Sequence, residues 1–534
     1  MNGKILMTVV GLLLLSSMAA VEAGPLKGVP GSEHELPLAE DKIKPTLFSP
    51  ALGAGLAIML LVIYLIIGLI INQYMAKDTH TFLIAERNVG LGMGIASVSA
   101  TWMWAMGIAA SGAVAYLFGF AGLWWFCLPQ IPAFALIVPF TRYIRNVMPG
   151  GYTLAEYARV RLGNLGRFLF ALFLILGAIG FASINIKGVS LGLMTMFGFD
   201  FRPSVYLIAF GVLAYAIFGG MWRVAVISTI QYWMICIFGF IALATAIHQV
   251  GGTTWIAERM MQTPIRYQTL MDPKTIVEYG ILGNYGLISG VICEQAFWQR
   301  VWSMKRKAVE NSFIQCIIWV TLEIILFGYF GIIGIAMGAN LMTDLGGDGA
   351  AVASWVTSHI GVGYAALAYM MVLFAAGMSS LDAAYMAVGS ILAVDFVKYY
   401  KPGISDNGLR NVVRIGMVIG AIGAVGVVES GLSMVGIIIM TLTARGGLLF
   451  PLLLTFIWDK TSEVGACLGI ILSSVIGIPI YFYYSNWWGL IAIQGIALGV
   501  TVIISLIKPG RPHKLELLLE ADIVKRSRLG EDLK

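Results

Sequence analysis

Charged residues are scarce in this chain. Asp, Glu, Lys and Arg make up 12% of its 534 residues, whereas 59% of the residues are hydrophobic. A soluble domain carries about 25% charged residues, so this composition excludes a soluble protein and indicates one that crosses a membrane many times. The formal net charge of +6 is interpreted as a topology signal, and no nucleic-acid partner is expected.

Cysteines are also few, and their spacing fits neither a metal site nor a redox pair. All five fall inside apolar segments without a CxxC motif: Cys127, Cys236, Cys293, Cys316 and Cys467. We expect membrane-buried thiols that form no disulfide and hold no metal. The chain also lacks a GxxxxGK[ST] nucleotide motif, which agrees with transport driven by a gradient, and it lacks any recognisable nucleophile–base or metal arrangement, which argues against an enzyme.

The N-terminal residues are typical of a secretory signal peptide. Lys4 precedes an apolar core from Ile5 to Leu15, and small residues follow that core. The core is too short to span a bilayer comfortably. We therefore expect a signal peptide over 1–23 and an extracytoplasmic segment over 24–47.

Thirteen later segments are long and apolar enough to cross a bilayer. In lipid they must be helices, because the backbone has to satisfy its own hydrogen bonds. They lie at roughly 48–74, 90–117, 121–142, 166–188, 203–221, 224–248, 279–302, 312–337, 364–397, 409–428, 432–458, 463–483 and 486–507. Together they predict one membrane domain over 48–507, followed by a tail over 508–534.

The distribution of Lys and Arg orients these helices. If the N-terminus lies outside, most basic residues fall in the inside loops and the tail, and Arg223 and Arg300 are counted with them. The outside loops after the first helix hold only Arg202, Arg259, Arg266 and Lys274. The positive-inside rule therefore predicts a multi-pass protein of the cell membrane with its N-terminus outside and a cytoplasmic tail.

The segment at 90–117 contains the run SATWMWAMGIAAS, from Ser99 to Ser111, at what should be the middle of the membrane. Small residues let helices approach closely in lipid, which explains the glycine and alanines. It does not explain two tryptophans beside hydroxyls, because a buried indole N–H needs a partner. We therefore favour a helix that lines a cavity or is locally unwound over one that only packs tightly.

A second interrupted segment lies at 279–302. It is weakened by Gly280, Gly283, Gly286 and Gly290, and its polar residues are Asn284, Glu294 and Gln295. The two segments are five helices apart, and a unit of five helices inverts its own topology when it is repeated. We therefore predict an inverted repeat over about 90–248 and 279–458, with an interrupted helix first in each half, as in many transporters.

In the segment at 364–397, the adjacent hydroxyls of Ser379 and Ser380 follow Ala376 by about one turn. A sodium ion is a hard cation that prefers oxygen ligands. Serine hydroxyls on an intact helix, with carbonyls freed from an unwound neighbour, would supply them. The alternative is a pair of serines bonded to the carbonyls of their own helix, and the dipeptide alone does not separate the two.

Several stretches, in the same order and at the same spacing, resemble the sodium:solute symporter family, which has the LeuT-type fold. They are TLAEYARVRLG (153–163), GGMWRVAVISTIQ (219–231), EQAFWQR (294–300), GMSSLDAAYMAVGSILAVDF (377–396) and GGLLFPLLLTFIWDKTSEVGACLG (446–469). Within the family, SATWMWAMGIAAS followed by YLFGFAGLWWF is most similar to the urea and polyamine symporters. The implied fold is an all-α membrane protein, a LeuT-type 5+5 inverted-repeat transporter with 13 transmembrane helices.

The resemblance implies a sodium site between the segments at 90–117 and 364–397. Its ligands would be the hydroxyls of two serines and the carbonyls of three further residues: Ser379, Ser380, Ile95, Val98 and Ala376. It also implies a solute site beside the ion, formed by Thr101, Trp102, Trp104, Trp124, Glu294 and Gln295. Sugar symporters have a glutamate at the position of Trp124, which argues against a sugar. Many members have an aspartate at the position of Ser228, so the resemblance does not carry over a second sodium site or the usual sodium exit step.

The ionisable residues within the predicted spans include Glu294, Glu323, Asp382 and Arg445. A charge inside the membrane is a functional candidate by default. We assign Glu294 to the solute or to a gate, and Asp382 to the support of the serine pair or to a gate. Arg445 would pair with a carboxylate or orient a bend, and Glu323 receives no role.

Together these features predict import of a small polar solute, such as urea, an amine or a polyamine, driven by sodium through alternating access. Proton coupling and a carboxylate or amino-acid solute are the alternatives. A channel or a transporter-like sensor is disfavoured, because a channel needs no cation site and a sensor usually carries a cytoplasmic signalling domain. The oligomeric state is not predicted.

Overall fold

The computed structural model describes residues 36–39, 48–76, 78–432 and 434–510, and the regular structure in these ranges is helical apart from one isolated bridge between Val89 and Met304. The helices are α2 (Pro50–Tyr74), α3 (Thr79–Ile84), η2 (Ala85–Arg87), α4 (Leu91–Trp102), α5 (Ala105–Cys127), α6 (Gln130–Val147), α7 (Leu154–Phe197), α8 (Phe201–Ala216), α9 (Gly220–Gln249), α10 (Gly252–Met261), α11 (Ile265–Gln268), α12 (Pro273–Thr275), η3 (Ile276–Leu282), α13 (Gly283–Ile292), α14 (Gln295–Ser303), α15 (Arg306–Met337), η4 (Gly349–Ala351), α16 (Val352–His359), α17 (Gly363–Ile391), η5 (Leu392–Lys398), α18 (Asp406–Glu429), α19 (Met434–Ile457), α20 (Glu463–Tyr483) and α21 (Asn486–Ile507). The predicted signal peptide over 1–23 and nearly all of the predicted tail over 508–534 lie outside the described residues.

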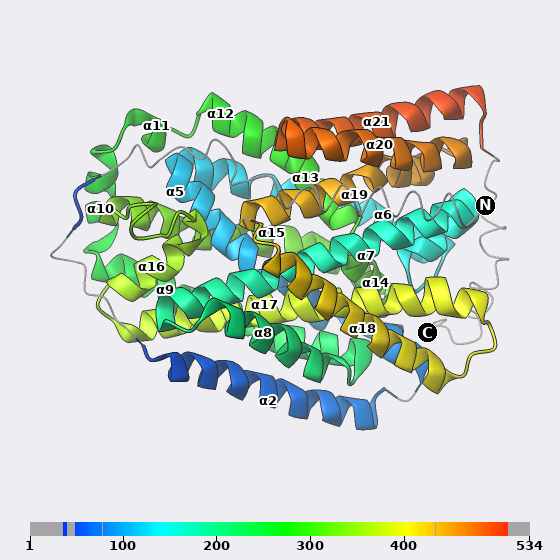
Figure 1. The fold of residues 1–534 in the computed structure, drawn as a ribbon, viewed down its shortest axis with the longest axis horizontal. Coiled ribbons are helices and arrows are strands. Elements are labelled where there is room, and N and C mark those ends of the chain that lie inside the picture. The colour runs from blue at the N-terminus through cyan, green and yellow to red at the C-terminus, as the bar shows by residue number, and fades with distance from the viewer. Residues whose placement is uncertain (1–35, 40–47, 77, 433, 511–534) are drawn as a thin grey trace.

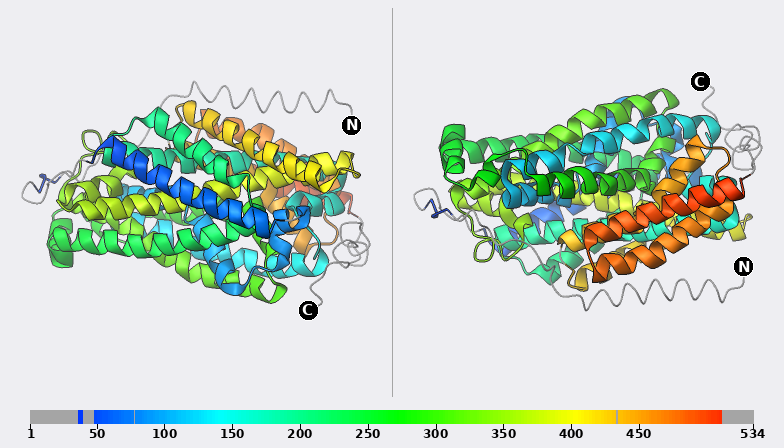
Figure 2. Two further views of the ribbon diagram at one scale, coloured as in Figure 1. Left: turned by 90° about the horizontal axis from the view of Figure 1, so that it is seen from below. Right: turned by 90° about the horizontal axis from the view of Figure 1, so that it is seen from above.

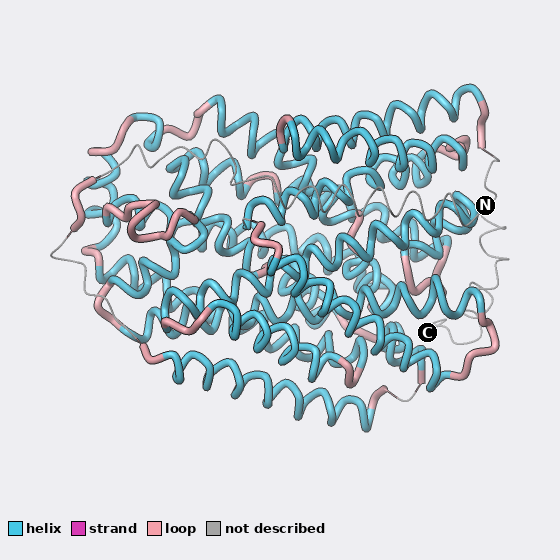
Figure 3. Tube along the Cα trace, viewed as in Figure 1, coloured by secondary structure: helices cyan, strands magenta, loops and turns pink. Residues whose placement is uncertain are grey.

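The helices form an elongated bundle whose long members run roughly along its long axis (Figure 1). Helix α2 covers one side of the bundle, and α20 with α21 covers the opposite side (Figure 2). The short helices α10, α11 and α16 gather at one end (Figure 1). Most loops lie at the two ends of the bundle (Figure 3), as expected for a protein whose helices cross a bilayer.

Among the described residues, nine helices are long and apolar enough to cross a membrane, or ten if the bent pair Pro273–Ile292 and Gln295–Ser303 is one span. This count treats Gly107–Val147 as one span and leaves α8 out because α8 is short. Each of the thirteen predicted segments coincides with described helices. The count of thirteen crossings holds if α5 and α6 cross separately and if α8 and α19 also cross, and it stays a prediction, as does the orientation.

Helix α17 is the central element of the bundle. Nearly all of its residues from Ala365 to Ile391 are buried, and it packs against α7, α9, α18 and α4. Close approach depends on small residues, because a Cβ at Gly377 would lie 2.3 Å from a Val189 methyl of α7. Outer helices such as α2 instead expose isoleucines and leucines to the surroundings. The sequence places the serine pair on this buried central helix.

Both segments that were predicted to be interrupted are broken in the structure. In the first, α4 ends at Trp102 and α5 begins at Ala105. In the second, α13 ends at Ile292 and α14 begins at Gln295, with a bend of 46°. We call these the first break (103–104) and the second break (293–294). The repeat that would relate them stays a prediction.

Candidate functional site

The first break releases a backbone carbonyl. The Met103 N–H still bonds to a carbonyl of α4, but the backbone of Met103 leaves the helical region (ψ 57°). The amide of Ala105, the first residue of α5, donates to Asn185 Oδ1 of α7 at 3.0 Å. In a continuous helix this amide would bond to the Thr101 carbonyl. The Thr101 carbonyl therefore becomes available to another partner.

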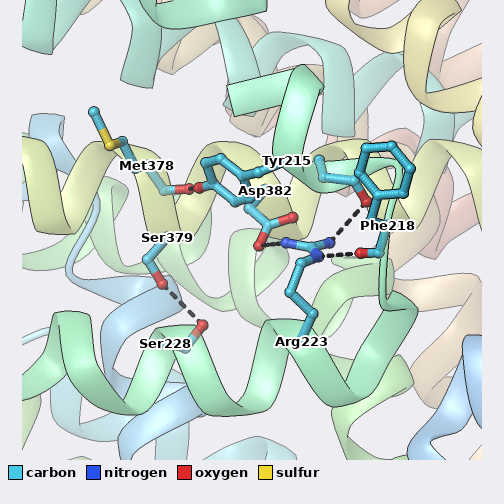
Figure 4. A network of polar contacts seen from close by, with 8 residues as sticks. Tyr215, Phe218, Arg223, Ser228, Met378, Ser379 and Asp382 are labelled. Atoms are coloured by element: carbon cyan, nitrogen blue, oxygen red, sulfur yellow. Dashed lines mark hydrogen bonds and ion pairs between the residues drawn. The ribbon is translucent and has the colours of Figure 1, made fainter. Parts of the chain in front are cut away.

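A set of buried oxygens fills the space between α4, α9 and α17. The Ser380 hydroxyl donates to the freed Thr101 carbonyl at 2.9 Å. The Ser379 hydroxyl lies 3.1 Å from the Ser228 hydroxyl, which faces it from α9 (Figure 4). All four residues are at most 1% exposed. We call Thr101 O and the hydroxyls of Ser228, Ser379 and Ser380 the oxygen cluster. All four atoms are oxygens, which hard cations prefer as ligands, and all four are neutral.

Two of the predicted carbonyl ligands lie away from the first break. Ile95 and Val98 are inside α4, where carbonyls are engaged in the hydrogen bonds of the helix itself. The Ile95 carbonyl also accepts from the Cys316 thiol at 3.5 Å. The break falls later in the chain than these residues, so the carbonyl that it frees is that of Thr101.

The two tryptophans of the first break are buried in an aromatic cluster. The Trp102 indole N–H donates to Gln130 Oε1 at 2.7 Å, so a side-chain amide of α6 supplies the partner that the sequence requires. The Trp104 ring lies 6.0 Å from that of Trp102 and 5.2 Å from that of Phe181, between ring centroids. Thr101 donates its hydroxyl to the Ser97 carbonyl. Because Trp102 directly follows Thr101 in the chain, this aromatic cluster adjoins the oxygen cluster.

Two other predicted solute residues are not brought to this wall. Trp124, near the C-terminal end of α5, is 43% exposed. Gln295 is buried, but its amide accepts from the Leu154 N–H at 2.9 Å and donates to the Tyr152 carbonyl at 3.0 Å. Gln295 thus fixes the start of α7, and neither side chain contacts the aromatic cluster in the described contacts.

The second break is held by an ion pair. Glu294 caps α14 by accepting from the Ala296 N–H at 3.2 Å, and its carboxylate forms a buried salt bridge with Arg445 of α19. The Trp298 indole N–H donates to the Ile292 carbonyl at 2.6 Å, one of the carbonyls that the end of α13 leaves without a helical partner. The Arg445 guanidinium lies 5.7 Å from the centroid of the Phe181 ring. Phe181 therefore lies between the two breaks.

Asp382 forms a buried salt bridge with Arg223 (Figure 4). Arg223 also donates to the Phe218 carbonyl at 2.7 Å and to the Ala216 carbonyl at 3.1 Å. Asp382 follows Ser379 by about one turn of α17. The pair therefore fixes the end of α8 and the start of α9 against the part of α17 that carries the serines, which agrees with a supporting role for Asp382.

Arg300 is a site residue that the sequence analysis missed. Its Nε donates to the Ser97 hydroxyl at 2.9 Å and to the Ser97 carbonyl at 3.1 Å, so it joins α14 to α4. Arg223 and Arg300 were counted as charges of inside loops, yet both are at most 1% exposed. Their place in or next to apolar segments was the signal for a buried role, because such a charge needs a partner.

No group of three or more His, Cys, Asp or Glu side chains suited to a metal ion occurs in the part of the chain that the structure describes. The five cysteines all lie in that part, and they are free; four are buried and Cys236 is partly buried. The oxygen cluster is a candidate set of cation ligands among the described residues.

Comparison with known proteins places these features in a family. "Probable urea active transporter 3" of Schizosaccharomyces pombe is 22% identical over 77% of this chain and 66% of its own length. "Urea-proton symporter DUR3" of Oryza sativa subsp. japonica is 22% identical over 75% of this chain and 60% of its own. The chain thus spans less than two thirds of the length of these two relatives.

The fold is shared with a solved transporter. The substrate-bound, outward-open structure of a Na+-coupled sialic acid symporter matches with a TM-score of 0.72 and 17% identity, over 86% of this chain and 99% of that one. The sequence profile of a family of multi-pass membrane transporters, not enzymes, matches residues 82–473. From this match, which covers most of the membrane domain and both breaks, the chain belongs to the sodium:solute symporter family.

Proposed function

We propose that the protein is a sodium-coupled symporter that imports a small polar solute by alternating access. One observation carries the proposal: the first break frees the Thr101 carbonyl, and Ser380 of the central helix reaches it. Helices α4 and α17 thus meet through a neutral hydrogen bond, which a sodium ion can replace with two ion–oxygen contacts. The ion would be held by the oxygen cluster, with Ala376 one turn earlier on α17.

This arrangement supports coupling because the ion and the solute share α4. A sodium ion that bridges α4 and α17 favours the conformation in which these helices are close, and that conformation also fixes Trp102 and Trp104. By linkage, the solute must then raise the affinity for sodium by the same factor. A potential of about 100 mV supplies about 2.3 kcal/mol per charge and a tenfold gradient about 1.4 kcal/mol, enough for roughly 500-fold accumulation per ion.

The solute site would lie between the two breaks, bounded by Thr101, Trp102, Trp104 and Phe181. The Glu294–Arg445 pair is neutral as a unit, which favours a neutral hydrogen-bonding solute over a free carboxylate. Urea has this chemistry, and two relatives are named as urea transporters. Urea is therefore the first solute to test, and amines and polyamines follow.

The test is uptake by proteoliposomes that contain the full chain, with labelled urea, amines, amino acids and monocarboxylates in parallel. An inward sodium gradient is expected to drive accumulation, and Ser379→Ala or Ser380→Ala is expected to abolish the stimulation by sodium. Ser390→Ala is the matched control, because Ser390 lies on the same buried helix and donates only to the Ala387 carbonyl of that helix. Unchanged sodium stimulation in both serine variants would refute the site.

Proton coupling is the second candidate, because one relative is named as a urea-proton symporter. In the same vesicles, a pH gradient that drives uptake without sodium would establish proton coupling in place of sodium coupling. Flux that never exceeds equilibration of the solute would instead indicate a channel.

A further inference from the structure

Glu323 is a buried carboxylate inside the membrane that the proposed mechanism does not use. It lies within α15 and is 7% exposed. Its Oε1 accepts from the Cys236 thiol of α9 at 3.1 Å, and its Oε2 makes no hydrogen bond. Among the described residues, no Lys, Arg or His forms an ion pair with it. An ionised carboxylate in such surroundings is costly.

The groups that face this carboxylate offer no compensating charge. The titratable ones are Tyr232 and Cys236 from α9 and Cys316 from α15, and none of these side chains is ever a cation. Helix α4 contributes alanines, which pack against the Tyr232 ring. The Tyr232 hydroxyl is buried beside Glu323 and Cys236. A proton on Glu323 removes the charge and adds an O–H donor that can point to the Tyr232 oxygen.

We propose that the Glu323 carboxyl group, together with the Tyr232 hydroxyl, is a proton-binding site, and that the proton is a second cation bound by this protein. In the conformation seen here the carboxyl group holds the proton. Release returns the proton to water and regenerates the carboxylate, with no other reactant. The role of this proton in transport rests on the proposed function, whereas its binding does not.

The position of the site links it to the oxygen cluster. Ser228, Tyr232 and Cys236 are spaced i, i+4 and i+8 on α9, so they share one face of that helix. The first of them contacts Ser379, and the last contacts Glu323. A proton at one end and a cation at the other therefore act on the same face of α9.

A second connection runs through α15. Cys316 lies two turns before Glu323 on α15, and it accepts from the Ser99 hydroxyl of α4 at 3.2 Å. Glu323 thus lies where α15 meets α9, next to the α4 alanines that pack against Tyr232, and separation of these helices would give the carboxyl group more contact with water. Proton binding therefore favours the closed arrangement, and proton release favours separation.

Infrared spectroscopy tests the site without any solute. Attenuated-total-reflection spectra of the full chain in lipid are recorded near neutral pH, and the spectrum of Glu323→Gln is subtracted from that of the wild type. The expected result is a protonated-carboxyl C=O band that the variant loses. Glu310→Gln is the control, because Glu310 is on the same helix, has a side chain that is 44% exposed and is paired with Arg142, and it should leave the band intact. A wild-type band that survives in Glu323→Gln would overturn the proposal.

Cys236→Ala supplies a second variant if Glu323→Gln does not fold. Loss of the thiol donor to Oε1 should move the band to higher frequency without abolishing it, because a C=O group that loses a hydrogen bond stretches at higher frequency. An unmoved band would show that the protonated group is elsewhere and would overturn the proposal. Since these spectra read the carboxyl group itself, failed sodium-driven uptake would count against the proposed function alone.

Discussion

Each of the two broken helices leaves backbone groups without helical partners, and the two breaks satisfy these groups with different chemistry. At the first break, the two partners that the described contacts give to the freed backbone are neutral: Asn185 accepts from Ala105, and Ser380 donates to Thr101. At the second break, the cap residue Glu294 is charged and is paired with Arg445. A neutral hydrogen bond is exchanged for an ion contact at small cost, because its net contribution is about 1 kcal/mol. A buried ion pair cannot be exchanged for another contact at such a small cost.

This difference indicates separate tasks for the two breaks. Under the proposed function, the first break gains and loses a cation, and the partners seen there are neutral groups that an ion can replace. The second break is built to keep its geometry, because loss of one partner leaves a charge in a medium that cannot solvate it. The first break would therefore carry the coupling ion, and the second would fix one wall of the solute site.

The largest expected effect comes from breaking the ion pair of the second break. Arg445→Gln leaves the Glu294 carboxylate buried without a partner, which should lower the free energy of unfolding by about 3–5 kcal/mol. Thermal unfolding of the purified full chain in detergent measures the loss. The double variant Glu294→Gln with Arg445→Gln should recover most of it, because no unpaired charge remains. A double variant as unstable as the single one would show that packing, not charge, holds this break.

A smaller effect is expected at the first break. Asn185→Ala removes the acceptor of the Ala105 N–H and leaves a buried donor unsatisfied, which should cost about 1–3 kcal/mol. The same unfolding assay measures the change. Thr195→Ala on the same helix is the control, because Thr195 is exposed and donates to carbonyls of its own helix, so it should change stability by less than about 0.5 kcal/mol. A loss larger than that of Arg445→Gln would reverse the contrast between the breaks.

The sequence predicted both breaks because glycines, hydroxyls and indoles are out of place at mid-membrane depth. The first falls inside the run from Ser99 to Ser111, and the second falls at Glu294. It could not predict where within each run the backbone leaves the helix. At the first break, Asn185, which lies on another helix far away in the sequence, accepts from the Ala105 N–H, and the Thr101 carbonyl is left for Ser380.

The sequence also could not predict which residues pair with the buried charges. Asp382 was identified as a supporting residue, but its partner Arg223 was counted as a loop charge, because the positive-inside rule considers position along the chain and not depth in the fold. Pairing between helices depends on which faces meet, and a single sequence shows only the spacing on each face. The same limit left Glu323 without a role until its neighbours on α9 were visible.

The smallest expected effect on stability comes from removing one indole hydrogen bond at each break and comparing the two variants. Trp102→Phe and Trp298→Phe remove the same atoms, so the loss of ring volume largely cancels when the two variants are compared. Trp102→Phe leaves Gln130 Oε1 without its donor, but this amide is a side chain that can turn, and its Nε2 still donates to the Phe126 carbonyl. Trp298→Phe leaves the Ile292 carbonyl without its donor, and this carbonyl belongs to the backbone and cannot turn to another partner.

Trp298→Phe should therefore be less stable than Trp102→Phe by about 1 kcal/mol, measured as the difference between their unfolding temperatures. Equal temperatures would mean that water or a rearranged donor satisfies the Ile292 carbonyl, and the second break would then be less rigid than its ion pair indicates.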